Sequence, residues 1–442
     1  MSQIFALLLL LIPMVVIHEM GHFLAAKFFG MRVYEFAFGF GKKLASFRYG
    51  NTEYRFNLLP LGGYVNFMGE SLYHNDIPHD PDHFLNKPKY ARLVVLLMGP
   101  AFNFFLAFGL FVLLQHQPDY IPKPYGEPFT VGWVAPDSPE AQAGLQTGDR
   151  ITHLQGQPVV DRERLLHDIV LSPGETIRLR VERNGETRDL AYVCDTDEIE
   201  GIGKIQFRQA FRSRIARVVS GYPAEEVGLM PDDIIVAIDE TPAFIVNTSD
   251  FNVISQLIQH GDGDTRLLRI ERDGVLMDFK VPLKELEDGS RMIGISYGYE
   301  SQVLYRTWPE ATASAWERCV FFSTYIFRTI NRLVSMKLSV KALNSPVSIS
   351  RIAKEELEQG FWPFVLLMAI LSLNLAIANL LPIPVLDGGE ILVIMVEWVA
   401  RRDLSFDMKQ NIKMVGFIFL VGLMGTVLVS DTIKEFVLRN PG

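Results

Sequence analysis

Two histidines and a glutamate interrupt an apolar segment near the start of the chain. The stretch reads VVIHEMGHFLAAKFF from Val15, so His18 and His22 are four residues apart. On a helix this spacing places both imidazoles on one face, where they can hold one metal ion with Glu19 beside them. The pattern is typical of zinc hydrolases, in which the glutamate accepts a proton from a water that the metal activates. The alternative is a chance meeting in an amphipathic helix, but an ionisable residue near the centre of a membrane span costs at least about 2.5 kcal/mol and normally has a function.

A third ligand is needed, and Asp387 is the best candidate. It lies in NLLPIPVLDGGEI, where two prolines end an apolar span and two glycines follow. Irregular backbone at membrane depth is tolerated only inside protein or along a watery cavity, so a metal ligand is the simplest explanation for an aspartate there. A capping residue at a membrane exit is the alternative. Upstream on the same span, Asn374 is predicted to pack against a neighbouring helix, whereas Asn379 is nearer the break and could hold a substrate backbone.

Four segments are long and apolar enough to cross a bilayer, which takes about 20 residues. They are residues 4–29, 93–115, 361–381 and 412–429. The segment AWERCVFFSTYIFRTINRLV from Ala315 contains four charged residues among apolar residues at loose helical spacing, and is predicted to be an amphipathic helix at the membrane interface. The composition, 49% hydrophobic with 21% charged residues, likewise predicts membrane segments joined to a soluble part.

Basic residues predict the orientation of the spans. They cluster after the first span, before the second, and between the third and fourth, so these short loops are predicted to be cytoplasmic. Both termini and the acidic stretch from about His116 to Phe361 then lie outside. The start MSQIFALLLL lacks a basic region and a cleavage site, so the first span is predicted to act as its own uncleaved signal.

Several function classes and sites are disfavoured. The net charge of −9 argues against a nucleic-acid partner. Cys194 and Cys319 are too few and too far apart for a thiolate metal site or a disulfide framework, and are predicted to be packed thiols. The stretch YHNDIPHDPDH, with His74, His79 and His83, is predicted to be a solvated loop rather than a metal patch.

The stretch between the second and third spans contains an internal repeat. SPEAQAGLQTGDRI from Ser138 matches YPAEEVGLMPDDII from Tyr222 at an offset of 84 residues. Each copy is followed by strand-like alternation and a hairpin turn, RNG at 183–185 and RDG at 272–274, where glycine takes the positive φ that such turns need. The pair resembles two tandem PDZ domains, a fold that binds extended peptides by strand addition. Two unrelated β-rich folds that share a turn are the alternative.

In order along the chain, HEMGH, GPAFNF from Gly99, the PDZ-like pair and NLLPIPVLDGG resemble the site-2 protease family, specifically the RseP-like intramembrane zinc metalloproteases of Gram-negative bacteria. The resemblance implies an enzyme in the bacterial inner membrane, with the PDZ domains and both termini in the periplasm. It implies substrate contact at Asn379 and a membrane-associated β-hairpin in EYRFNLLPLGGYVNFM from Glu53. Related sequences often carry histidine after LDGG, where this chain has Glu390, which leaves local details open. The implied zinc site has one ion bound by His18, His22 and Asp387, with Glu19 as catalytic acid and base.

The expected fold is a polytopic α-helical membrane protein with four transmembrane helices, two inserted PDZ-like α+β domains and the hairpin. The expected boundaries are residues 1–115 for the first transmembrane half, 127–205 and 206–300 for the PDZ domains, 309–360 for amphipathic interfacial helices, and 361–442 for the second half. The link HQPDYIPKPYG contains three prolines that limit its swing, so the PDZ pair is expected over the outer mouth of the helices, as a size filter. Recruitment of a new carboxyl terminus is the competing role.

The expected activity is cleavage of the transmembrane segment of single-span membrane proteins. From the family, the substrate is a pre-trimmed anti-sigma factor or a signal-peptide remnant. A strand edge at Tyr54, Phe56 and Leu58 could accept the unwound substrate, although a hairpin that only packs on the bilayer is equally favoured. A PDZ adaptor with a vestigial metal site, a tethered protease facing the soluble phase and a metal transporter stay open, and the sequence does not indicate an oligomeric state.

Overall fold

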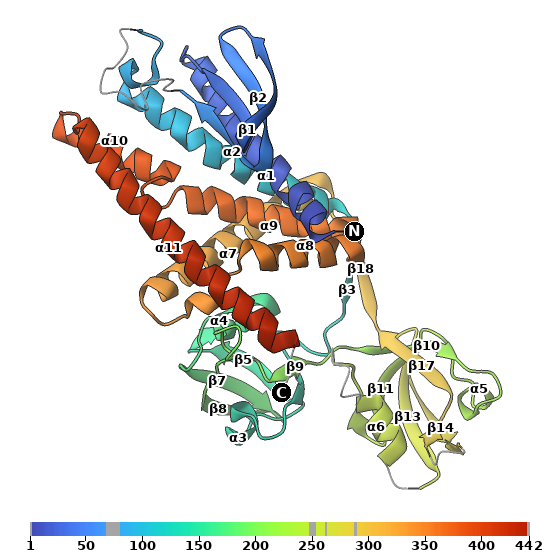
Figure 1. Cartoon of the computed structure of the whole chain (residues 1–442). Helices are drawn as coiled ribbons and strands as arrows, with labels where there is room; N and C mark the ends of the chain where they lie inside the picture. The colour runs from blue at the N-terminus through green and yellow to red at the C-terminus, as the bar shows by residue number, and fades with distance from the viewer. Residues whose placement is uncertain (1, 68–79, 247–252, 261–262, 287–289, 440–442) are drawn as a thin grey trace. The chain divides into compact units, whose positions relative to one another are not determined.

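The chain folds into a helical unit and a β-rich unit, shown by a computed structural model that describes residues 2–67, 80–246, 253–260, 263–286 and 290–439 (Figure 1). The helical unit comprises Met1–Gln117, Arg306–Leu333 and Val340–Gly442, and the β-rich unit comprises Pro118–Tyr305 and Val334–Ser339. His74 and His79 of the predicted solvated loop lie outside the described residues, as does Met68 at the end of the predicted hairpin.

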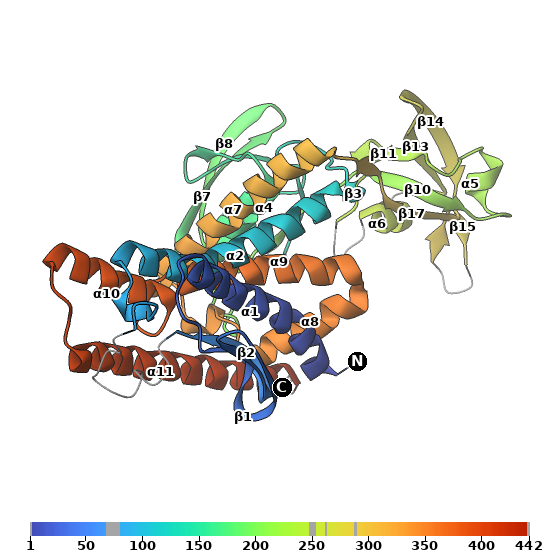
Figure 2. The same cartoon turned by 90° about the horizontal axis from the view of Figure 1, so that it is seen from above.

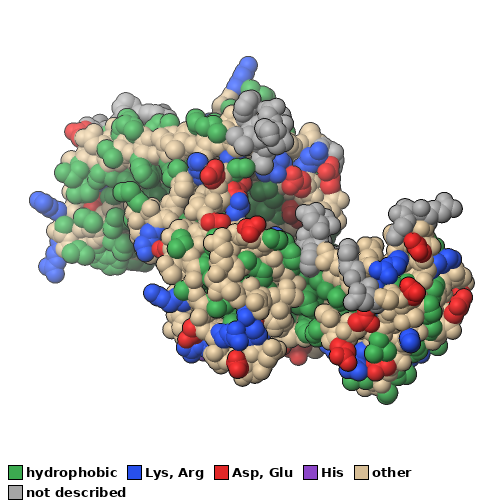
Figure 3. Space-filling model, turned by 90° about the horizontal axis from the view of Figure 1, so that it is seen from below, with side chains coloured by type: hydrophobic (Ala, Val, Ile, Leu, Met, Phe, Trp, Pro, Cys, Tyr) green, Lys and Arg blue, Asp and Glu red, His purple; other side chains and the backbone are tan. Residues whose placement is uncertain are grey.

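Four helices of the described chain are long and apolar enough to cross a membrane, which confirms the four predicted spans. They are α1 (Gln3–Phe28), α2 (Lys89–His116), α9 (Phe361–Asn379) and α11 (Phe406–Arg439). The unit also contains α7 (Trp308–Val334), α8 (Pro346–Gln359) and α10 (Asp387–Ala400). One region of the molecular surface is dominated by hydrophobic side chains with few charges, as expected of lipid-facing helices (Figure 3).

Helix α2 lies beside α7 in Figure 2, and α2, α7 and α9 share one hydrophobic cluster. Ala107 and Phe111 of α2 pack with Ala315 and Cys319 of α7 and with residues of α9. The predicted amphipathic helix therefore exists, and it buries small side chains against a spanning helix, while its position at the interface stays a prediction. Cys319 is a buried free thiol within this contact, as predicted.

The third span ends where the prolines predicted. Helix α9 ends at Asn379, and the backbone resumes a helical course at Asp387, the first residue of α10. The sequence did not predict α10. Two ion pairs join it to α11, Lys409 to Glu397 at 2.6 Å and Lys413 to Glu390 at 2.9 Å.

Strands β1 (Glu35–Tyr49) and β2 (Thr52–Asn66) form a hairpin, in which the stretch from Glu53 that was predicted to be a whole hairpin is the second strand, and the register also corrects the predicted edge. Both strands bend, so that residues 35–38 pair with 53–56 on one side and with 63–66 on the other. Residues 53–56 also pair with 45–48. Tyr54 and Phe56 are therefore in the interior of the sheet. Residues 63–66 pair with a strand on one side only, and they lie next to α1.

The bends in the hairpin come from glycines. Gly39, Gly41 and Gly62 have φ of +83°, +84° and +144°, a region that side chains disfavour. The hairpin is also tied by charge, since hydrogen bonds from Arg55 and Lys43 hold the pKa of Glu53 down at about 2. Beyond the hairpin, His83 corrects another prediction, because it is fully buried and its Nδ1 accepts the N–H of Leu85 at the start of η2 (Phe84–Asn86).

The internal repeat appears as two similar sets of elements in the β-rich unit. The first set is α3 (Pro139–Gln142), β5 (Arg150–Leu154), β6 (Gln157–Pro158), α4 (Arg162–Val170), β7 (Thr176–Arg183) and β8 (Glu186–Val193). The second is α5 (Pro223–Glu226), β11 (Ile234–Ile238), β12 (Thr241–Pro242), α6 (Val253–His260), β13 (Thr265–Arg272) and β14 (Val275–Pro282). Each set encloses its own hydrophobic core.

Further strands complete the unit. They are β3 (Asp119–Pro122), β4 (Val131–Val134), β9 (Phe207–Gln209), β10 (Ser213–Val218), β15 (Lys284–Glu285), β16 (Arg291–Met292), β17 (Ile295–Tyr299) and β18 (Ser301–Leu304). The first set forms a sheet of order β6-β5-β7-β8, and the second a sheet containing β14-β13-β11-β10-β17. At the predicted turns, Gly185 and Gly274 have φ of +80° and +78°.

The same buried ion pair stabilises both copies of the repeat. Asp149 accepts two hydrogen bonds from Arg183, at 2.6 and 2.7 Å, and its carboxylate is fully buried. Asp233 and Arg272 repeat this arrangement at the same two distances. The aspartates of the sequence repeat thus connect each short helical turn to its hairpin. Cys194, in the first core, is a packed thiol as predicted, and burial raises its pKa to about 11.

Candidate metal centre

The two histidines of HEMGH converge with Asp387, as the sequence suggested. His18 and His22 lie one turn apart on α1, both buried, with their Nε2 atoms 3.2 Å apart. Oδ2 of Asp387 lies 3.2 Å from Nε2 of His18 and 3.5 Å from Nε2 of His22. In the described residues this is the group of side chains arranged to hold a metal ion.

The two glycines after Asp387 allow the chain to fold so that Asp387 lies next to α1. A Cβ on Gly388 would lie 2.3 Å from the carbonyl oxygen of Leu381, and one on Gly389 would lie 2.3 Å from that of Ile383. Only glycine therefore lets the loop of residues 380–386 fold back against the start of α10. The aspartate occupies the first turn of α10, so its direction is fixed by the helix rather than by a flexible loop.

The three atoms fit a tetrahedral zinc ion. Atoms that each lie 2.0–2.1 Å from such an ion are about 3.3 Å apart, close to the three separations found here. Oδ2 of Asp387 is buried and finds no hydrogen-bond donor of good geometry among the described residues, so it is an acceptor without another partner. Two imidazoles and one carboxylate are a known catalytic zinc set that leaves a fourth position open.

One face of α2 surrounds the histidines. The carbonyl of Val95 accepts a hydrogen bond from Nδ1 of His22 at 2.8 Å, and the side chain of Asn103 lies 3.3 Å from Nδ1 of His18. Val95, Gly99 and Asn103 follow one another at intervals of four residues, so they share this face. No role was predicted for any of the three, although Gly99 and Asn103 both lie in the GPAFNF stretch. An asparagine in an apolar helix was the available signal, because such residues often hydrogen-bond a neighbouring helix.

Gly99 makes the room that the imidazoles occupy. A Cβ on this residue would lie 2.2 Å from Nε2 of His22 and 2.9 Å from Cε1 of His18. On the other helix, a Cβ on Gly21 would lie 2.2 Å from the carbonyl oxygen of Met98. The two glycines together allow α1 and α2 to approach closely enough for a metal site to form between them.

Glu19 lies between the histidines and the hairpin. A Cβ on Gly63 would lie 3.2 Å from its Cγ, and its carboxylate interacts with the backbone of Val65. Gly63 and Val65 belong to the segment 63–66, which pairs with another strand on one side only. The candidate base is thus placed beside a strand edge.

The other predicted substrate residues are not brought to the metal ligands by a described contact. Asn379 is half-buried at the end of α9, and its side chain makes no hydrogen bond within the described part of the chain. The ring of Tyr54 stacks on Phe47 within the hairpin, and the side chains of Phe56 and Leu58 are about half exposed. Glu390, one turn after Asp387, forms an ion pair with Lys413 of α11.

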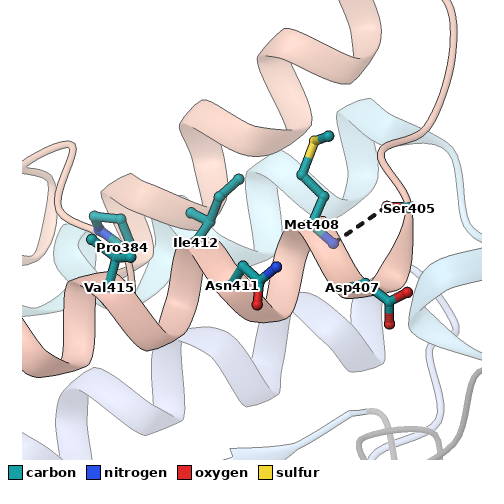
Figure 4. A pocket seen from close by; sticks show the side chains of 7 residues that line it. All are labelled: Pro384, Ser405, Asp407, Met408, Asn411, Ile412 and Val415. Atoms are coloured by element: carbon teal, nitrogen blue, oxygen red, sulfur yellow. Dashed lines mark hydrogen bonds between the residues drawn. The ribbon is translucent and has the colours of Figure 1, made fainter.

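A mostly apolar, open groove of about 610 Å³ includes Pro384 of the proline break in its lining (Figure 4). Its lining residues are Pro384, Ser405, Asp407, Met408, Asn411, Ile412 and Val415. None of them is a member of the metal-ligand cluster, so the groove is separate from the candidate reaction centre. It borders the loop that carries Asp387, since a Cβ on Gly416 of α11 would lie 2.4 Å from the carbonyl oxygen of Pro384.

Comparison with known proteins matches residues 5–423 to the model of peptidase family M50. A protein of Neisseria meningitidis, provisionally named a zinc metalloprotease, is 29% identical over 96% of this chain and 95% of its own length. The regulator of sigma E protease of Salmonella typhi is 27% identical over 95% of each chain. That of Haemophilus influenzae is 26% identical over 95% of this chain and 96% of its own length.

The glycine on α2 gives a direct test of the metal site. Gly99→Ala should abolish stoichiometric zinc binding, because the added methyl group would occupy the space of the His22 ring. Zinc content of the purified protein, measured by inductively coupled plasma mass spectrometry, checks this. Gly109→Ala on the same helix is the matched control and should retain zinc, since a Cβ there meets no atom within 4 Å. Full zinc occupancy in Gly99→Ala would contradict the assigned geometry.

Proposed function

This chain belongs to peptidase family M50, the site-2 protease family, and is a membrane zinc metalloprotease; from that premise we propose that it cleaves the transmembrane segment of single-span membrane proteins. The observation that carries the proposal is the convergence of His18 and His22, on the spanning helix α1, with Asp387, which begins α10 after the loop that follows the spanning helix α9. A metal centre formed by such helices is suited to a scissile bond that lies within the bilayer.

In the proposed mechanism the chain's own residues divide the work. His18, His22 and Asp387 would hold one zinc ion, which when bound would polarise a peptide carbonyl and acidify a water. Glu19 accepts the proton of the attacking water and passes it to the leaving amine. The carbonyl of Val95 orients the His22 ring, so that its Nε2 lone pair is directed at the cluster.

The intact convergence of the ligand atoms favours this enzyme over an adaptor with a vestigial site. His22→Ala and Asp387→Ala should each lose zinc and cleavage together. Glu19→Gln should retain zinc and lower the cleavage rate by about 10²- to 10⁴-fold, the usual contribution of a general base. The measurements are zinc content and cleavage of a single-span substrate in proteoliposomes. His116→Ala, on α2 but outside the cluster, is the control and should keep both; undiminished cleavage by Asp387→Ala would remove it from the ligand set.

Substrate presentation is proposed to use the strand edge at residues 63–66. A transmembrane helix has its carbonyls closed in helical hydrogen bonds and must be unwound before attack. An unwound segment can add to a free strand edge, and this edge adjoins Glu19. This proposal replaces the predicted edge at Tyr54, Phe56 and Leu58. Tyr54 and Phe56 each have a paired strand on both sides, so their backbone is not at an edge.

Cross-linking tests this edge. In the inactive Glu19→Gln background, Val65→Cys should form a disulfide with a cysteine placed next to the scissile bond of the substrate. Phe47→Cys, on the opposite edge segment of the same hairpin, should cross-link at least about tenfold less. The native cysteines are both buried, which limits background reaction. Equal cross-linking at the two positions would remove strand addition at 63–66 from the mechanism.

The proposed substrate is an anti-sigma factor already shortened outside the membrane, or a signal-peptide remnant, in a bacterial inner membrane. The two repeat domains are proposed to be PDZ domains in the periplasm, where both termini also lie. We propose that they act as a size filter. Within the β-rich unit, β3 near its start pairs with β18 near its end, from Asp119–Leu304 to Pro122–Ser301.

Deletion of residues 127–299 separates the two roles of the repeat domains. A filter acts by a steric penalty on bulky ectodomains, so the deletion should raise cleavage of full-length substrate and preserve cleavage of the trimmed form. Quantitative immunoblotting of both substrates, with zinc content as the folding control, provides the measurement. Loss of trimmed-substrate cleavage by a variant that still binds zinc would favour recruitment of the new carboxyl terminus instead.

A further inference from the structure

Asn103 is fully buried on α2, and its side-chain amide lies 3.3 Å from Nδ1 of His18. Its backbone carbonyl accepts the hydroxyl of Ser372 on α9 at 2.9 Å, and Ser372 is fully buried as well. Asn103 therefore contacts α1 through its side chain and α9 through its backbone.

A histidine that binds a metal through Nε2 must carry its proton on Nδ1, and a hydrogen-bond acceptor at Nδ1 fixes this tautomer. His22 has such an acceptor in the carbonyl of Val95, 2.8 Å from its Nδ1. Because a carbonyl only accepts, the Nε2 lone pair of His22 is free for the metal. His18 needs an equivalent acceptor, and Asn103 is the side chain in place to provide one.

In one of its two possible orientations, the amide of Asn103 has its nitrogen 3.3 Å from Nδ1 of His18. An amide nitrogen only donates, so that orientation would leave the proton of a neutral His18 on Nε2, directed at the cluster. Oδ1 of Asn103 meanwhile has no hydrogen-bond partner in the described chain. A half-turn about one bond exchanges the two amide atoms at the same positions. Each orientation leaves one amide atom without a partner, so the requirement of the metal for Nε2 decides between them.

We propose that Asn103 is a positioning residue that accepts the Nδ1–H of His18 through its side-chain oxygen and so directs Nε2 of His18 at the zinc ion. The inference rests on the proposed role of His18 as a ligand. Helix α2 would then accept the Nδ1–H of both histidines, with a backbone oxygen for His22 and a side-chain oxygen for His18. Val95 and Asn103 are eight residues apart, which is about two helical turns. Val95 contacts His22 and Asn103 contacts His18, so the order of these partners along α2 is the reverse of the order of the histidines along α1.

Two substitutions distinguish this role from simple packing. Asn103→Leu keeps the approximate size and removes the acceptor, and should weaken zinc binding by about 10- to 100-fold. Asn103→Asp keeps an acceptor oxygen and should bind zinc within about threefold of the native chain, or more tightly. Packing alone predicts the reverse order, because an apolar side chain is easier to bury than a carboxylate. Competition of the full-length protein against a chromophoric chelator, with zinc alone as the probe, gives the affinities.

Controls make each outcome decisive. Ser372→Ala loosens the backbone of Asn103 without touching the His18 ring, and should change zinc affinity less than Asn103→Leu. If Asn103→Leu does not fold, as judged by its melting temperature, Asn103→Ala provides a second side chain without an acceptor. Native zinc affinity in the acceptor-free variant, or equal losses in Asn103→Leu and Asn103→Asp, would overturn the proposal. His18→Ala separates it from the proposed function: if that variant keeps zinc, the ligand assignment itself fails.

Discussion

The close approach of α1 and α2 is the contact on which the metal centre depends. Between two lipid-exposed helices, water provides little hydrophobic driving force, and association relies on tight packing of small residues. Gly21 brings α1 against the backbone of Met98, and Gly99 leaves the hollow that the imidazoles fill. A larger residue at either position would separate the helices, and His22 would then lose the carbonyl of Val95.

A second constraint is the return of the chain after α9. Breaking a helix in a bilayer exposes backbone groups that need partners, so the break must be covered by protein or reached by water. Gly388 and Gly389 let the loop fold against α10, and Gly416 lets α11 cover the carbonyl of Pro384. The ion pair between Glu390 and Lys413 then ties α10 to that covering helix. Glu390, which stands where related sequences often carry histidine, thus has an ion-pair partner in Lys413.

The sequence predicted those features whose signals are local. Apolar length gave the four spans, the proline pair gave the break before Asp387, and the matched glycines and aspartates gave the repeat and its turns. The convergence of the distant Asp387 with His18 and His22 was also expected, but the sequence failed where the exact register of one segment against another decides the outcome. The hairpin bends at its glycines, so its second strand supplies both an interior and an edge segment, and a pattern of alternating residues does not show which is which.

The role of Asn103 was missed for a related reason. An asparagine within an apolar helix signals a partner, but the identity of the partner depends on the register of α2 against α1, which no local pattern contains. His83 failed in the same way, since a histidine in a polar stretch gave no sign that it would be buried at the start of a short helical turn.

Because the surroundings of the cluster are apolar, the hydrogen-bond partner of each polar atom there can be used to infer what binds. In such surroundings an unpaired buried polar group is costly, so its persistence points to a missing partner. Nδ1 of His22 and the backbone oxygen of Asn103 have theirs, while Oδ2 of Asp387 and Oδ1 of Asn103 do not. A metal ion would satisfy the first, and the proton that the metal displaces to Nδ1 of His18 would satisfy the second. The two deficits therefore have one cause, because filling the metal position sets the tautomer that completes the hydrogen bond behind it.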